Sequence, residues 1–354
     1  MRGIWSRGAV VGLVVMAMLV VAACAPAAEP TTGPAAPAAE APEVITIKMQ
    51  SLAGPGQLWR FEKFETAVRE MSNGRIEFKI FSGGEIVPTV EMLDAVKSGV
   101  LDMAFGCGAY WMDTMPIGGV EYGLPFSWQE PLLDEYVVFW NRGLLDLVRE
   151  AYAERGVYYL GPVHTDPYAL IATKECHSVA DLQKLKIRAT GGIAKTFEKV
   201  GIPTVFLPAE EFYVALATGT IDGVISGGAS EYYDYKLYEV AKYYYRPAVQ
   251  ACAVCNQFIN MDLWNSLSPD LQAILVYATS DFSQWMALDY VDREYQLQKE
   301  MTNYGVEVIT FPDEVMAELT QAALPVWDEI GAASPRAAKG VEIVKDWFRT
   351  KGVL

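Results

Sequence analysis

The chain has 354 residues, of which 28 are basic and 44 acidic, so its formal net charge is −16. Such an acidic chain is not expected to bind nucleic acid or anionic lipid through a basic face. About 310 residues follow the N-terminal region, which is enough for two α/β lobes.

The first 23 residues have the pattern of a secretory signal peptide. Arg2 and Arg7 are followed by an apolar run over residues 9–23, and small residues lead to Cys24. A cysteine at this point resembles a bacterial lipobox, which implies cleavage before Cys24 and diacylglycerol on its thiol. The alternatives are an ordinary signal peptide or a single anchor helix, although the run is short for a membrane span.

Residues 24–43 are nearly all Ala, Pro, Thr, Gly and Glu. This composition cannot form an apolar core and predicts a disordered, extended tether. Without Arg2 and Arg7, 26 basic residues face 44 acidic ones, giving a mature charge of −18. We therefore predict an extracytoplasmic body that is attached to the membrane through its lipid anchor.

Strands alternate with helices along the rest of the chain. In the first half a strand precedes a helix over residues 57–71, and residues 75–81 alternate as a second strand. In the second half, residues 186–190 read as a strand and residues 192–200 as a helix. This pattern predicts an α/β fold with mainly parallel sheets, in which ligands lie at the carboxyl ends of strands.

Two segments, residues 88–102 and 208–222, share one frame. A proline precedes each predicted helix, a glycine ends it and a strand follows. Five residue types recur at equal offsets: Pro88 and Pro208, Glu91 and Glu211, Ala95 and Ala215, Gly99 and Gly219, Asp102 and Asp222. Coincidence between two common helix–strand units is the alternative, but the matches favour two related lobes.

The stretch "KIRATGGIAKT", residues 186–196, superficially resembles a phosphate-binding loop. Ala189 and Ala194 occupy the positions of the two glycines that allow a backbone to wrap around phosphates. A nucleotide site is therefore not expected. Arg188 falls near the carboxyl end of the predicted strand, where a ligand would bind.

The cysteines and histidines do not form a metal or catalytic motif. Cys252 and Cys255 lie three residues apart on a predicted strand, so their side chains point to opposite faces. The only histidines are His164 and His177, and the sequence has neither G-x-S-x-G nor H-E-x-x-H. We expect buried free thiols, no cofactor and no enzymatic activity.

The second half carries the resemblance to a known family. The run "LQKLKIRATGG…GIPTVFLPAEEFYVALATGTIDGVISG" resembles the solute-binding receptors of tripartite ATP-independent periplasmic (TRAP) transporters. The stretches at 108–126, 238–248 and 258–275 are similar to the branch that includes 2-oxo-acid receptors. The resemblance implies a two-lobed periplasmic-binding-protein-like fold that closes on a small organic acid and delivers it to TRAP membrane subunits.

The resemblance also implies a division of the chain. A long helix would cross both lobes, beginning at Ser268-Pro269, which offers a cap and a proline in the first turn. The expected segments are as follows: first lobe 44–166 and 251–285, second lobe 167–250 and 305–354, lobe-spanning helix 269–304.

In such receptors an arginine matching Arg188 binds the ligand carboxylate. A guanidinium fork independently matches two carboxylate oxygens, although a structural salt bridge is the alternative. Three aromatic residues, Trp59, Tyr110 and Tyr168, occupy positions expected at the cleft, although aromatic residues more often fill cores.

The expected metal ligands of the 2-oxo-acid branch are absent. Ile225 and Ser226 stand where a Glu-Trp pair is expected, and Gln250 and Ala251 replace a second acid. Cations need hard oxygen ligands, so we expect a ligand bound without metal, with Ser226 and Gln250 as hydrogen-bond donors. Glu231 and Asp234 are the nearest acids, and would reach the site only with displaced strand boundaries.

Two other functions remain as alternatives. One is a ligand sensor for a signalling partner, and the other is an extracytoplasmic enzyme. Whether the last helices form a homodimer is left open.

Overall fold

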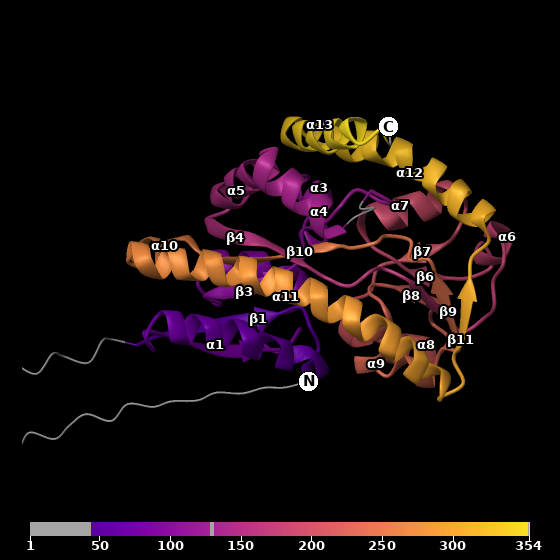
Figure 1. Ribbon diagram of the computed structural model, residues 1–354, viewed down its shortest axis with the longest axis horizontal. Coiled ribbons are helices and arrows are strands. Elements are labelled where there is room, and N and C mark those ends of the chain that lie inside the picture. The colour runs from indigo at the N-terminus through magenta and orange to yellow at the C-terminus, as the bar shows by residue number, and fades with distance from the viewer. Residues whose placement is uncertain (1–43, 128–130, 353) are drawn as a thin grey trace, which may run out of the picture. The chain divides into compact units, whose positions relative to one another are not determined.

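The computed structural model describes residues 44–127, 131–352 and 354. The predicted signal peptide, Cys24 and the whole predicted tether fall outside these ranges. The described part contains two β-sheets with helices packed on them, which confirms the predicted two-lobed α/β class (Figure 1). No helix in the described ranges combines the length and apolar character needed to cross a membrane.

The first sheet has five strands in the order β2-β1-β3-β10-β4. β1 runs parallel to β2 and β3, whereas β10 is antiparallel to both β3 and β4. The strands are β1 Ile45–Ser51, β2 Ile76–Phe81, β3 Met103–Gly106, β4 Val157–His164 and β10 Val254–Asn260. The helices of this part of the chain are α1 Phe61–Met71, α2 Met92–Lys97, α3 Gly118–Glu121, α4 Pro131–Tyr136, α5 Leu144–Glu154 and α10 Met261–Ser266.

The second sheet has six strands in the order β11-β9-β5-β8-β6-β7. The strands are β5 Leu170–Ala172, β6 Ile187–Arg188, β7 Thr204–Val205, β8 Gly223–Ile225, β9 Tyr243–Arg246 and β11 Glu307–Thr310. The helices that follow these strands are α6 Val179–Leu182, α7 Gly191–Lys199, α8 Phe212–Ala217 and α9 Ala229–Asp234. We call each sheet with its helices a lobe.

The two repeated segments form the same unit. Each proline stands just before a 3-10 turn that leads into a short helix, and Gly99 and Gly219 end these helices with φ of +77° and +69°. The repeated aspartates also do the same work: Asp102 accepts the backbone N–H of Lys48, and Asp222 accepts that of Lys186. Both carboxylates therefore fasten the repeat to the neighbouring strand.

Two extended segments connect the lobes, one after β4 and one before β10. Tyr168 and Gln250 face each other on these segments, with Tyr168 N donating to Gln250 O at 2.8 Å. The helix α11, Pro269–Thr302, begins with proline in its first turn, packs against α1, β4 and α9, and so reaches both lobes (Figure 1).

The C-terminal helices depart from the expected division of the chain. α12, Asp313–Ala332, packs on α7 of the second lobe, whereas α13, Pro335–Thr350, packs against α3 and α5. The apolar side chains of α13, such as Val341 and Phe348, join the same buried cluster as Leu144 and Val148 of α5. By its contacts α13 covers the first lobe, not the second, because its apolar stripe matches that surface.

Candidate ligand-binding pocket

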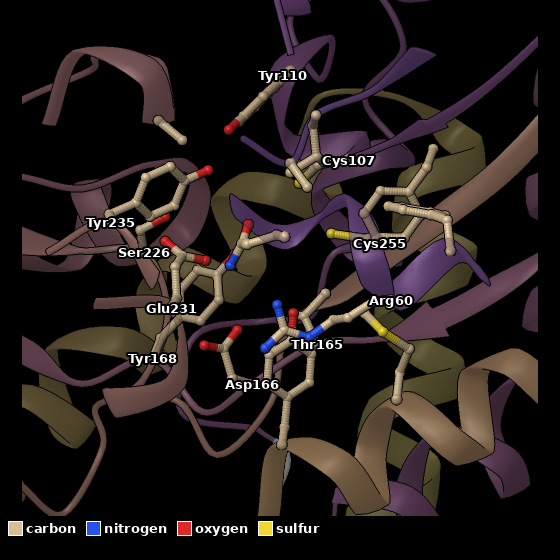
Figure 2. Close-up of a pocket in the computed structure, with 18 residues that line it drawn as sticks. Arg60, Cys107, Tyr110, Thr165, Asp166, Tyr168, Ser226, Glu231, Tyr235 and Cys255 are labelled. Carbon is tan, nitrogen blue, oxygen red and sulfur yellow. The ribbon is translucent and has the colours of Figure 1, made fainter. Parts of the chain in front are cut away.

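A small cavity of about 30 Å³ lies between the lobes (Figure 2). It is built mainly from stretches of chain that are far apart in sequence: the segment around Arg60, the end of β3, the start of β10, the first connection, the turn after β8 that leads into α9, and α11. Its polar and sulfur-bearing lining residues are Gln57, Arg60, Cys107, Tyr110, Thr165, Asp166, Tyr168, Ser226, Glu231, Tyr235, Cys255, Met286 and Tyr290. Its size suits a small ligand of a few non-hydrogen atoms.

Two carboxylates, Asp166 and Glu231, share one side of the cavity. Asp166 is 1% exposed, and its Oδ2 accepts the backbone N–H of Gly228 at 2.7 Å. A Cβ on Gly227 would lie 2.6 Å from Asp166 Oδ2 and 2.7 Å from Glu231 Oε2, so glycine is required for both acids to approach. The second oxygens, Asp166 Oδ1 and Glu231 Oε1, are buried without a hydrogen-bond partner.

Burial perturbs both carboxylates. It raises the pKa of Asp166 well above its ordinary value, and the nearby charge of Glu231 adds to this. The pKa of Glu231 is also raised by burial, although a hydrogen bond with Ser226 and the charge of Arg188 act in the opposite direction. The two acids therefore hold protons more tightly than exposed carboxylates do.

Arg60 lines the cavity, and each nitrogen of its guanidinium contacts a partner on the wall. Its Nη1 donates to Asp234 at 3.0 Å, its Nη2 donates to the Ser230 hydroxyl at 2.7 Å, and its Nε lies 3.4 Å from Asp289. Asp234 also accepts from Arg293 at 3.0 Å. Two cations and two carboxylates therefore balance one another on this wall.

Arg188 lies behind the cavity wall, at the carboxyl end of β6. Its Nε donates to Leu207 O at 2.9 Å and its Nη1 donates to Ile225 O at 3.0 Å, which fixes the guanidinium over the ring of Phe212. Its Nη2 is buried without a partner. Its positive charge acts on Tyr110, Tyr168 and Glu231, all of which line the cavity.

The predicted site residues divide into two groups. Ser226, Tyr110 and Tyr168 line the cavity, and Arg188 adjoins it. Trp59 does not line it: the residue is 38% exposed, and its ring packs edge-on against Trp285.

Gln250 also lies outside the cavity. Its Nε2 donates to Cys252 O at 2.8 Å, and its backbone pairs with Tyr168 in the connection between lobes. Neither Trp59 nor Gln250 therefore lines this cavity.

Arg60 and Asp166 were missed by sequence reasoning. The available signal for Asp166 was its place in "HTDP", directly after β4 at the start of a lobe connection. Glu231 was considered only as a replacement acid. It reaches the cavity because α9 begins at Ala229 and turns its first residues toward the site.

Two cysteines line the cavity from adjacent strands. Gly106 of β3 pairs with Asn256 of β10, which places Cys107 opposite Cys255. A hydrogen bond with Cys107, together with burial, raises the pKa of the Cys255 thiol. Cys252 joins a different buried cluster, but it precedes β10, so the two cysteines do not share a strand as predicted. The four cysteines of the described part are free thiols.

A buried polar cavity between two related α/β lobes defines a two-lobed binding protein. The sequence model of the bacterial extracellular solute-binding protein family 7 (DctP) matches residues 56–334, and the chain therefore belongs to this family. TRAP-transporter receptors share the fold, as the comparisons below show.

A monocarboxylate 2-oxoacid-binding periplasmic protein of Nostoc sp. is 26% identical over 83% of this chain and 80% of its own length. A TRAP periplasmic solute-binding protein of Chromohalobacter salexigens, solved with (S)-(+)-2-amino-1-propanol, superposes with a TM-score of 0.80 at 24% identity. That match covers 87% of this chain and 96% of the other. A TRAP periplasmic solute-binding protein of Pseudoalteromonas atlantica, solved with sodium and pyruvate, superposes with a TM-score of 0.79 at 24% identity. That match covers 87% of this chain and 95% of the other.

Proposed function

We propose that this receptor captures a small organic acid between its lobes and delivers it to TRAP membrane subunits. The observation that carries the proposal is Arg188, whose Nη2 is buried without a partner beside the cavity while its other donors fix its position. A guanidinium held in this way is preorganised to donate to a carboxylate. The names of the Nostoc and Pseudoalteromonas proteins, which refer to 2-oxo acids and pyruvate, support this ligand class.

The roles of the predicted site residues remain part of this proposal. Ser226, Tyr110 and Tyr168 would contact the bound acid, and no metal would be needed. Among the described residues, no three His, Cys, Asp or Glu side chains gather in an arrangement that could hold a metal ion. The pair Asp166 and Glu231 could supply some of the oxygens that a cation needs, so this point requires measurement.

The test is calorimetry on Arg188→Lys and Arg188→Ala, with pyruvate, lactate and any acid that copurifies as probes. A hydrogen bond to a charged group contributes about 1.5–3 kcal/mol, so each variant should bind about 10- to 100-fold more weakly. Arg149→Lys is the matched control, because Arg149 also donates to two carbonyl oxygens, Tyr159 O and Leu160 O, away from the cavity. Unchanged affinity in a folded Arg188 variant would refute the assignment.

We also propose that Cys24 is lipidated and that residues 24–43 connect this lipid to the body. Cys24→Ser should abolish acylation and leave solute binding unchanged. A cysteine that carries two or three acyl chains gives stable membrane residence. Intact mass and detergent partitioning decide the matter, and a wild-type chain without acyl mass in the aqueous phase would contradict it.

A further inference from the structure

The charges around the cavity do not balance once the internal ion pairs are assigned. Arg60 and Arg293 are countered by Asp234 and Asp289, which stand on the wall and not in the cavity. The charge of Arg60 also acts on Asp166 and Glu231, and that of Arg188 acts on Glu231. Counted together, the three cations Arg60, Arg293 and Arg188 face four carboxylates, those of Asp234, Asp289, Asp166 and Glu231. An anionic ligand that entered alone would add a further negative charge to this set.

The two carboxylates are placed to receive donors from a ligand. Asp166 Oδ1 and Glu231 Oε1 are both buried without a partner, and both side chains border the same cavity (Figure 2). Leaving a buried acceptor unsatisfied costs about 1–3 kcal/mol. Their other oxygens converge on Gly227, which keeps the two carboxylates on one side of the cavity.

The third unsatisfied atom has the opposite polarity. Arg188 Nη2 is a donor, and the guanidinium acts on Tyr110 and Tyr168, which border the cavity. The site thus offers a donor with positive charge and, separately, two acceptors with negative charge. A small molecule with complementary ends would satisfy all three atoms at once.

We propose that the ligand is a small zwitterion, an amino acid whose carboxylate is held by Arg188 and whose ammonium group donates to Asp166 and Glu231. This inference rests on the proposed function, because it takes the carboxylate–Arg188 contact as given. An ammonium group has three donors and one positive charge. It fills both vacant acceptors and offsets the charge that a simple carboxylate would leave uncompensated.

The protonation of the acids is consistent with this assignment. Burial raises the pKa of both carboxyls, the charge of Glu231 adds to this at Asp166, and an approaching cation would lower both pKa values again. The cavity of about 30 Å³ limits the amino acid to a small one. The competing explanation is that a metal ion, bound together with an oxo acid, compensates the negative charge of the carboxylates. The experiment below distinguishes this from binding of an amino acid.

The experiment uses matched pairs of probes. L-alanine and pyruvate each have three carbons and one carboxylate, and differ in carrying an amine or an oxo group. Glycine and glyoxylate are the corresponding two-carbon pair. Calorimetry is run on the whole mature protein with these pairs, D-alanine, serine and proline, with and without chelator, in sodium and in a bulky organic cation. Mass spectrometry identifies any ligand released on denaturation.

Glu231→Gln and Asp166→Asn are the diagnostic variants, since each keeps the shape of the side chain and removes its charge. Glu294→Gln is the matched control. Glu294 is also a buried acid beside α9, but its oxygens are taken by Ala229 N, Tyr244 and Gln298, and it does not line the cavity.

We expect an amino acid to bind at least about 10-fold more tightly than its oxo counterpart, without need of a cation. Glu231→Gln and Asp166→Asn should each weaken it by about 10- to 100-fold, while Glu294→Gln should not. Equal or tighter binding of the oxo acids, with or without metal, overturns the ammonium site but leaves the carboxylate proposal standing. Failure of every amino acid also overturns it. Failure of all acids, with a recovered ligand that has no carboxylate, overturns the proposed function itself.

Discussion

Glu121 should make the folded protein less stable as the pH rises. It is fully buried beside Tyr152 and Asn256, whose hydroxyl and amide donate to its two oxygens at 2.9 and 2.6 Å. Burial raises the pKa of this carboxyl to about 7, and these hydrogen bonds offset only part of the effect. The unfolded chain has no such burial, so its carboxyl titrates near the ordinary 4.5.

The sign and size of the effect follow from proton linkage. Between the two pKa values the folded state binds more protons than the unfolded state, so the free energy of unfolding falls as the pH rises. Since one pKa unit corresponds to about 1.4 kcal/mol, Glu121 contributes a loss of about 2.5 kcal/mol between pH 5 and pH 8. For a chain of this size the loss corresponds to about 5 °C in Tm.

Glu121→Gln tests this value by chemical and thermal unfolding at several pH values. Glutamine stays neutral at every pH. If the Asn256 side-chain amide flips, its Oδ1, which has no partner in the wild type, can accept a hydrogen bond from the amide of the new glutamine. The variant should lose about 2.5 kcal/mol less than wild type between pH 5 and pH 8. The wild-type slope also contains contributions of the same sign from other buried acids, so the difference between the proteins is the measured quantity.

Glu154→Gln serves as the control. This exposed carboxylate pairs with Arg336, which lowers its pKa through a hydrogen bond, so its titration falls below the range from pH 5 to pH 8. The control should reproduce the wild-type slope. Identical pH dependence of wild type and Glu121→Gln would show that Glu121 is ionised in the folded protein and refute the reasoning.

Two further predictions concern the cavity. Gly227→Ala should weaken solute binding by at least about 10-fold, because its Cβ would push Asp166 and Glu231 apart. Gly56→Ala should not weaken binding, because its Cβ would lie no closer than 3.4 Å to another atom. Calorimetry that shows equal affinities for Gly227→Ala and wild type would contradict the prediction. The buried thiols of Cys107 and Cys255, which line the cavity, should react slowly with a thiol reagent in the native protein and rapidly in denaturant, as absorbance can follow. Fast native reaction of these two thiols would mean that the cavity wall opens readily.

The repeated part of the fold could be predicted from sequence because its physics is local. A proline before a helix, a glycine with positive φ after it and an aspartate at the next strand are set by neighbours within fifteen residues. The position of Arg188 at the carboxyl end of β6 was predictable for the same reason. The hydrogen bonds of Asp102 and Asp222 are different, since each aspartate accepts a backbone N–H from a residue far away in sequence, Lys48 or Lys186, which the local pattern does not specify.

The rest of the site depends on contacts that no local pattern encodes. Arg60 follows Trp59 directly, and the sequence does not show that Arg60 points into the cavity while Trp59 packs against Trp285. Asp166 enters the site only because the connection after β4 pairs with the connection before β10. α13 follows α12 in sequence, yet it packs on the opposite lobe.

The wall of the cavity around Arg60 contains residues of both lobes, so contacts between the lobes also affect the charges that a ligand would meet. Arg60 belongs to the first lobe, and its partners Asp234 and Ser230 belong to α9 of the second, so this ion pair spans the interface. The backbone N–H of Gly54 adds a second link, to the hydroxyl of Tyr235. Removing one partner of a buried pair is costly because the other charge is then uncompensated. The closed arrangement therefore sets the charge that a ligand meets. Because Arg60 is already paired with α9 across the interface, we expect a ligand to be selected by Arg188 and by the free oxygens of Asp166 and Glu231. Cys107 and Tyr110 of the first lobe form the facing wall of the cavity.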